Sequence, residues 1–290
     1  MATPLSAAAF LAALRAEGVK VVEVGNWRIH NRNSKGPWGP VHGVMIHHTV
    51  TSGTASTVRL CRDGHSALPG PLCHGVIAKD GTVHLVGYGR ANHAGSGDGD
   101  VLRAVINESA LPADNEADTD GNRHFYGFEC ENLGDGKDPW PAAQLEAIER
   151  VSAAVCRAHG WGARSVIGHL EWQPGKVDPR GFTMDAMRAR VAERLAAAKP
   201  KPTPKPPATF EPFPGAAFFA AGRRSAVITA MGKRLVAAGC GRYAVGPGPE
   251  WSEADRKSYA AWQRKLGYSG SAADGVPGRA SWDRLKVPNV

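Results

Sequence analysis

The chain has 290 residues and a net charge of +8, and its length suits two domains better than one. Hydrophobic residues make up 42% of the sequence and charged residues 21%, which is the range of folded, water-soluble proteins. No apolar run reaches the roughly 20 residues that a membrane-spanning helix needs, so the sequence excludes insertion into a membrane.

The N-terminal segment is rich in alanine but lacks the pattern of a secretory signal peptide. It has no basic start, and Arg15 and Glu17 interrupt the stretch where an apolar core would continue. Thr3 as N-cap, Pro4 in the first turn and Gly18 as the end predict a short amphipathic helix instead. We therefore expect a protein made in the cytoplasm without its own export signal.

The charge is divided unevenly along the chain. Residues 1–198 carry 20 Lys and Arg against 21 Asp and Glu, whereas residues 199–290 carry 15 against 6. Between these parts lies KPKPTPKPPA, whose proline density favours an extended spacer. The sequence thus predicts a nearly neutral domain over 1–198, a linker over 199–209 and a basic domain over 210–290. Such a basic bias suggests an anionic partner.

In the first domain, short β-branched segments alternate with helical ones. The segment after Trp140-Pro141 has the apolar spacing of a helix that ends at Gly160, and Thr183 is placed to start a last helix. A tight turn at residues 79–82 predicts a hairpin. The pattern indicates an α/β domain with a mixed central β-sheet flanked by helices. The predicted strands are 19–24, 43–48, 74–78, 82–86, 125–130 and 165–169.

The second domain is expected to be small and mainly helical. Residues 226–238 carry apolar side chains on one side, as a partly buried helix does. Ser252 and Asp255 have the spacing of a capping box and open a helix that ends at Gly267. A turn over 274–278 leads into a short final helix around Trp282.

Two histidines end apolar strands and are followed by a carboxylate. His47 ends V-M-I-H, His169 ends V-I-G-H, and Asp178 follows nine residues after His169. Two imidazoles and one carboxylate, with a fourth position left to water, are the protein ligands of a catalytic zinc site rather than of a closed structural one. Spacing alone leaves the alternative that these histidines are packed or solvated.

The motifs around these residues match a known family. HHT at 47–49, GFE at 127–129 and the G-H-x8-D run from Gly168 to Asp178 resemble type-2 N-acetylmuramoyl-L-alanine amidases, which are relatives of peptidoglycan recognition proteins. Longer phrases such as WGPVHGVMIHHT look like endolysins of phages that infect actinobacteria, over residues 20–195. YAAWQRKLGYSG and ADGVPG in the second domain resemble a peptidoglycan-binding module.

The resemblance implies a mechanism. His47, rather than His48, would bind Zn²⁺ together with His169 and Asp178, and the substrate would be the amide between N-acetylmuramic acid and L-alanine in peptidoglycan. Glu129 would be the catalytic carboxylate that takes a proton from water and passes it to the leaving amine. Lys176 would stabilise the oxyanion, and such a donor contributes about 3 kcal/mol of transition-state stabilisation. 

Further residues have two interpretations. His93, which matches a histidine lining the family's groove, and His74 are expected to contact substrate, with packing as the alternative. Some relatives have a tyrosine where this chain has Cys73, which places more weight on the catalytic carboxylate. Three aromatic residues of the second domain either bind the cell wall or pack in the core: Tyr259, Trp262 and Trp282.

The five cysteines form no CxxC pair. In a protein made in the cytoplasm they are expected to be free thiols, although a bridge between Cys61 and Cys73 is possible by their proximity in sequence.

Three hypotheses for the whole protein follow. The first is an endolysin that reaches the wall after a holin opens the membrane, cleaves peptidoglycan, and is held there by attachment of its basic domain to wall polymers. The second is a recognition protein that binds peptidoglycan without cutting it, and the third is an antibacterial toxin amidase. No nucleic-acid-binding motif accompanies the basic residues of the second domain, so no nucleic acid is expected as a partner.

Overall fold

The computed structural model describes residues 2–197 and 210–290, and the predicted linker lies outside them. The chain divides into two compact units, Met1–Thr203 and Pro204–Val290. No helix of the described residues is both long enough and apolar enough to cross a membrane.

A six-stranded mixed sheet forms the centre of the first unit, with the strand order β1–β6–β5–β9–β2–β10. β5, β9, β2 and β10 run parallel to one another, and β6 and β1 run in the opposite direction. The antiparallel β5–β6 pair is the predicted hairpin, and the predicted mixed sheet is confirmed. The strands are β1 (Val21–Glu23), β2 (Gly43–His48), β5 (Gly75–Ile77), β6 (Val83–Leu85), β9 (Phe125–Cys130) and β10 (Val166–Gly168).

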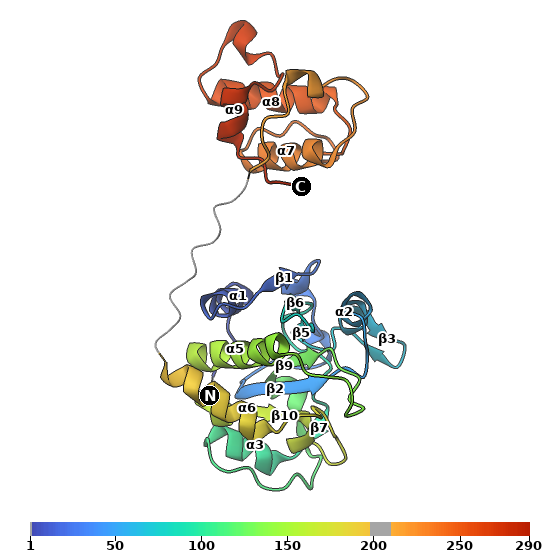
Figure 1. The fold of residues 1–290 in the computed structure, drawn as a ribbon, viewed down its shortest axis with the longest axis vertical. Coiled ribbons are helices and arrows are strands. Elements are labelled where there is room, and N and C mark those ends of the chain that lie inside the picture. Colours follow the sequence, from blue (N-terminus) through green and yellow to red (C-terminus); the bar gives the residue numbers. More distant parts are fainter. Residues whose placement is uncertain (1, 198–209) are drawn as a thin grey trace. The chain divides into compact units, whose positions relative to one another are not determined.

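Helices cover both faces of this sheet (Figure 1). On one face, α1 (Ala7–Ala16), α5 (Ala142–His159) and α6 (Met184–Ala196) contribute to the largest buried core. On the other face, α3 (Gly99–Ile106) packs in a second core, which includes Met45, Phe125 and Ile167. The parallel strands are therefore buried on both sides, as expected for apolar runs in a parallel sheet.

Alternation along β2 and β9 decides which side chains face α3. Val44 and Ile46 belong to the α5 core, whereas Met45 belongs to the α3 core. Because successive side chains of a strand point to opposite faces, His47 lies on the α3 side. The same alternation places Glu129 on that side, two positions after Gly127 and four after Phe125.

The N-terminal helix begins later than predicted. α1 starts at Ala7, and Ser6, not Thr3, is the N-cap: its hydroxyl oxygen accepts a hydrogen bond from the backbone N–H of Ala9 at 3.1 Å. Gly18, at φ +79°, follows the helix end as predicted. Smaller elements complete the first unit: α2 (Thr54–Asp63), β3 (Gly64–His65), β4 (Leu68–Pro69), β7 (Ser96–Gly97), β8 (Thr119–Asp120), α4 (Gly121–His124) and the 3₁₀ turns η1 (Trp27–Ile29), η2 (Asn33–Lys35), η3 (Ala163–Ser165) and η4 (His169–Glu171).

The second unit is mainly helical, as predicted. Its helices are α7 (Ala226–Ala237), α8 (Glu253–Lys265) and α9 (Arg279–Leu285), with 3₁₀ turns η5 (Ala216–Phe218) and η6 (Gly270–Ala273). The predicted capping box at the start of α8 is present, because the backbone N–H of Ser252 donates to Asp255 Oδ2 at 2.9 Å.

The aromatic residues of the second unit are mainly core residues. Tyr259 and Trp282 are 0% and 1% exposed, which corrects their assignment to a wall-binding surface. Trp262 is half-buried against the same core, and its indole N–H donates to the carbonyl of Ser281 at 3.0 Å. These side chains therefore stabilise the unit through burial of their rings.

The five cysteines are buried and present as free thiols, Cys61 and Cys73 included.

Candidate metal centre

Two adjacent strands bring the first two candidate ligands together. β2 and β10 are parallel, and Gly168 pairs with Ile46, so that His47 and His169 both follow at the same edge of the sheet. Their Nδ1 atoms lie 3.1 Å apart, and both rings are buried. This is the edge at which the carboxyl ends of the parallel strands meet, where sites of α/β proteins are commonly built.

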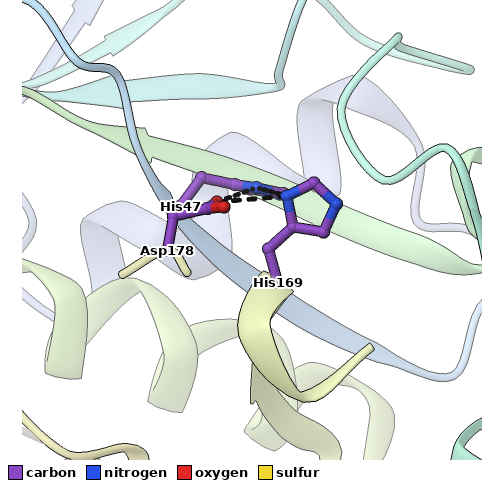
Figure 2. A group of neighbouring side chains, drawn as sticks. All are labelled: His47, His169 and Asp178. Carbon is purple, nitrogen blue, oxygen red and sulfur yellow. Dashed lines mark hydrogen bonds and ion pairs between the residues drawn. The ribbon is translucent and has the colours of Figure 1, made fainter. Parts of the chain in front are cut away.

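The third candidate ligand is returned to this edge by a loop. The backbone N–H of Leu170 donates to the carbonyl of Asp178 at 2.7 Å, which closes the loop between His169 and Asp178. Asp178 Oδ2 consequently lies 3.1 Å from the Nδ1 atom of each histidine. The three side chains point toward one another from separate segments (Figure 2).

The triangle of these atoms fits a zinc ion. Zinc lies about 2.0–2.1 Å from nitrogen and oxygen ligands in tetrahedral geometry, which places ligand atoms roughly 3.3 Å from one another. All three edges of the triangle measure 3.1 Å. Within residues 2–197 and 210–290, this is the one group of His, Cys, Asp and Glu that brings three donor atoms together in this way. Three protein ligands leave a fourth position free for water or substrate.

Burial of the His47 ring favours the protonation state that binds a metal. It lowers the pKa of His47 to about 4, so this imidazole is neutral at neutral pH. The centre therefore contains a neutral imidazole near neutral pH, as metal ligation requires.

His48 has a different role. Its Nδ1 accepts a hydrogen bond from the backbone N–H of Arg180 at 3.1 Å. Its ring also lies against Gly134, where an added Cβ would be 2.1 Å from Nε2. His48 thus joins the loops after β9 and after Asp178, and His47 is the histidine of this pair that lies in the triangle.

Glu129 lies beside the triangle. It is the register partner of His47 on the neighbouring strand, and its side chain projects on the same face of the sheet. Its Oε2 atom is buried without a hydrogen-bond partner among the described residues. Burial raises the pKa of Glu129 to about 8, the charge of Asp178 adds to this effect, and the charge of Lys176 opposes it. An unpartnered buried carboxyl next to a metal site is suited to proton transfer.

Lys176 lies in the loop between His169 and Asp178 and is exposed. Its charge acts on both Glu129 and His47, lowering the pKa of each.

The two histidines expected to contact substrate are buried behind the centre instead. His93 Nδ1 lies 3.1 Å from His47 Nε2, and His93 Nε2 lies 3.3 Å from the carbonyl oxygen of Phe125. His74 is fully buried: its Nε2 lies 2.9 Å from the carbonyl of Gly89, and its Nδ1 accepts from the N–H of Gly127 at 2.9 Å. Both ring nitrogens of each histidine are occupied within the fold, which corrects their assignment as substrate-binding residues.

Two neighbours of His169 were missed by sequence reasoning. His169 Nε2 lies 3.2 Å from the side-chain oxygen of Gln173. Trp172 is fully buried, and its indole N–H donates to the carbonyl of Ala94 at 2.9 Å. This bond attaches the loop between His169 and Asp178 to the core on the α3 face of the sheet. The missing side chain of Gly97 makes room for this indole, because an added Cβ would lie 2.2 Å from it. Trp172 could have been found as a bulky aromatic residue between two candidate ligands, but nothing in the sequence marks Gln173.

Two histidines and a carboxylate with an open position, next to a buried carboxyl, define the class of candidate metallohydrolases. A family model described as N-acetylmuramoyl-L-alanine amidase matches residues 37–181, which are half of the chain and contain all of these residues. The chain belongs to this family. No curated protein matches the sequence.

Several solved structures are similar to this chain. They include the endolysin N-acetylmuramoyl-L-alanine amidase LysCS from Clostridium intestinale URNW, at 17% identity over 59% of this chain and 95% of that one, with a TM-score of 0.38. The catalytic domain of XlyA matches at 18% identity over 60% and 99%, with a TM-score of 0.40. AmiD from E. coli, in complex with anhydro-N-acetylmuramic acid-L-Ala-D-gamma-Glu-L-Lys, matches at 14% identity over 89% and 91%, with a TM-score of 0.40.

Proposed function

We propose that this family member is a zinc-dependent enzyme that hydrolyses the amide between N-acetylmuramic acid and L-alanine in bacterial peptidoglycan. The observation that carries the proposal is the preformed triangle of His47, His169 and Asp178, with the unpartnered oxygen of Glu129 beside it. Family membership supports the bond that is cut, and the donor set supports the metal.

The three ligands would hold zinc, which when bound acts as a Lewis acid that acidifies water and polarises the scissile carbonyl. Glu129 accepts a proton from the attacking water as the new C–O bond forms. It then returns this proton to the nitrogen of L-alanine as the C–N bond breaks, so that the amine leaves neutral. Burial raises the pKa of Glu129 to about 8 in the metal-free protein and a bound metal would lower it, and a pKa between 4.5 and 8 suits both steps near neutral pH.

Lys176 stabilises the negative charge that develops on the carbonyl oxygen. Its charge lowers the pKa of Glu129 and of His47, which supports an action of the same charge on the oxyanion. Removing a donor of this kind from other enzymes costs about 3 kcal/mol of transition-state stabilisation.

Removal of the metal is expected to abolish wall hydrolysis, and zinc is expected to restore it. The measurement is the loss of turbidity of purified bacterial walls with the native protein, the chelator-treated protein and the chelated protein with zinc added back. Hydrolysis that persists in the chelator-treated protein, once metal analysis shows it to be zinc-free, would refute zinc dependence. Wall binding without any hydrolysis in all three samples would indicate a recognition protein.

We further propose that the second unit holds the enzyme on anionic wall polymers, as in an endolysin. Within residues 210–290, the one ion pair present joins Arg224 and Glu250, and other basic side chains, Lys257 and Arg264 of α8 among them, are exposed. Unpaired cations on a surface attract anionic polymers, and salt screens this attraction.

A fragment of residues 210–290 is expected to pellet with walls at low salt and to be released as salt increases, because the interaction is mainly electrostatic. The double substitution of Lys257 and Arg264 by glutamine should weaken binding, whereas Glu253→Gln on the same helix should not. Absence of binding at low salt, or binding that salt does not affect, would contradict this proposal.

A further inference from the structure

We propose that His93 and Gln173 are positioning residues that select the tautomer of the two metal-binding histidines, so that each offers the lone pair of Nδ1 to the metal. The inference rests on the proposed metal centre. It assigns a role to two side chains that lie against the Nε2 atoms of these imidazoles, whereas the Nδ1 atoms face the triangle.

The argument for His47 starts at a backbone carbonyl. The oxygen of Phe125 can only accept a hydrogen bond, so the His93 Nε2 atom, 3.3 Å away, carries the proton. His93 is buried and the neutral ring has one N–H, which leaves its Nδ1 as an acceptor. That atom lies 3.1 Å from His47 Nε2, which must then be the donor. The Nδ1 atom of His47 is consequently unprotonated and faces His169 and Asp178.

A single hydrogen bond sets the tautomer of His169. Its Nε2 lies 3.2 Å from the amide oxygen of Gln173, which is an acceptor, so Nε2 carries the proton and Nδ1 has the free lone pair. Both ligands therefore turn the same nitrogen toward the centre, and the two Nδ1 atoms are the atoms that lie 3.1 Å apart.

Asn122 and Gly127 fix the position of His93. The side-chain oxygen of Asn122 accepts from the N–H groups of His93 and Ala94, both at 2.8 Å. Gly127 on β9 leaves the space that the ring occupies, because an added Cβ would lie 2.4 Å from His93 Nδ1. The glycine of the GFE motif is thus explained by close approach of an imidazole.

Outer hydrogen-bond acceptors of metal-bound histidines orient the ring and raise its basicity, and their loss weakens metal binding about 10–100-fold. The test uses the full chain with zinc as the probe, and measures zinc affinity by competition with a chromophoric chelator. Gln173→Met, which keeps the length and removes the acceptor, should bind zinc about 10–100-fold more weakly. Gln173→Glu keeps an acceptor and should restore affinity to the wild-type value or above.

A second pair of variants tests the series of hydrogen bonds from Phe125 through His93 to His47. His93→Asn can place an amide oxygen near the position of Nδ1 and should keep more zinc affinity than His93→Phe, which keeps a ring without an acceptor. The melting temperature of the metal-free protein separates positioning from stability. Gln173 is only partly buried, so Gln173→Met should leave that temperature close to the wild-type value while zinc affinity falls.

The outcomes separate the inference from the function on which it rests. Equal zinc affinity in wild type, Gln173→Met and His93→Phe overturns the positioning role and leaves the metal centre standing. A loss of affinity in Gln173→Met that Gln173→Glu does not restore also overturns it. If the wild-type chain binds no zinc, the metal centre and this inference both fail.

Discussion

His169→Ala is expected to lose zinc and to reduce wall hydrolysis by roughly 10³-fold or more. The substitution removes one of three protein ligands, and a metal that polarises a carbonyl supplies several kcal/mol of transition-state stabilisation, each 1.4 kcal/mol of which is tenfold in rate. Zinc content after dialysis and the initial rate of wall clearing are the two measurements.

The matched control is His42→Ala. His42 directly precedes β2 and is buried like His169, but it lies at the opposite end of the strand from His47. Its removal should leave both zinc content and rate within a fewfold of wild type. Undiminished hydrolysis in His169→Ala would refute the assignment of the ligands.

Glu129→Gln is expected to retain zinc and to lose roughly 10²–10⁴-fold in kcat, because the amide cannot carry the proton. In the wild type, activity should fall as pH decreases through the pKa of Glu129, since the protonated carboxyl cannot accept a proton from water. Burial raises that pKa from 4.5 to about 8 in the metal-free protein, and the positive charge of a bound metal lowers it. The wild-type rate is therefore expected to decrease at low pH with a midpoint between 4.5 and about 8, the acid limb of the pH profile. The residual activity of the variant should lack this acid limb.

The same substitution should stabilise the metal-free protein. The folded state of the wild type favours the protonated carboxyl, so its stability decreases as pH rises from 4.5 toward 8. Glutamine does not ionise, so the variant does not lose stability in this way. The free energy of unfolding of metal-free Glu129→Gln should exceed that of metal-free wild type by about 2–4 kcal/mol at pH 8, with no difference near pH 4.

Glu131→Gln serves as the control for both effects. Glu131 lies one strand position past Cys130, and its buried carboxylate accepts from the N–H of Gly53 and the hydroxyl of Thr54 at the start of α2. Its replacement should lower stability without changing the pH dependence of the rate. A Glu129→Gln variant with the wild-type rate and acid limb would contradict the role of Glu129.

Much of the first unit follows from local pattern. The parallel strands of the sheet are mainly apolar runs that are buried on both faces, and the end of α5 coincides with a residue that stops helices, Gly160. The strand-end positions of His47 and His169 were readable because a parallel sheet brings such ends to one edge. The start of α1 was misplaced because Thr3 and Ser6 are both good N-caps, and the choice between them depends on tertiary packing.

The roles of single histidines were less predictable. Sequence does not show whether a histidine faces a groove or the interior, and His93 and His74 are held by contacts with residues 15–53 positions away in the chain. Gln173 has no distinguishing pattern, since its role depends on the loop that brings Asp178 back to His169. Tyr259 and Trp282 illustrate the same limit, because an aromatic residue on a helix face has the same spacing in a core as on a binding surface.

The chemical ends that appear when the 290-residue chain digests purified peptidoglycan test the central claim most directly. Hydrolysis of the bond between N-acetylmuramic acid and L-alanine predicts new amino termini that are L-alanine, released in proportion to the loss of turbidity and only while zinc is present. New reducing sugar ends in place of these amines, or amino termini of another residue, would contradict the account.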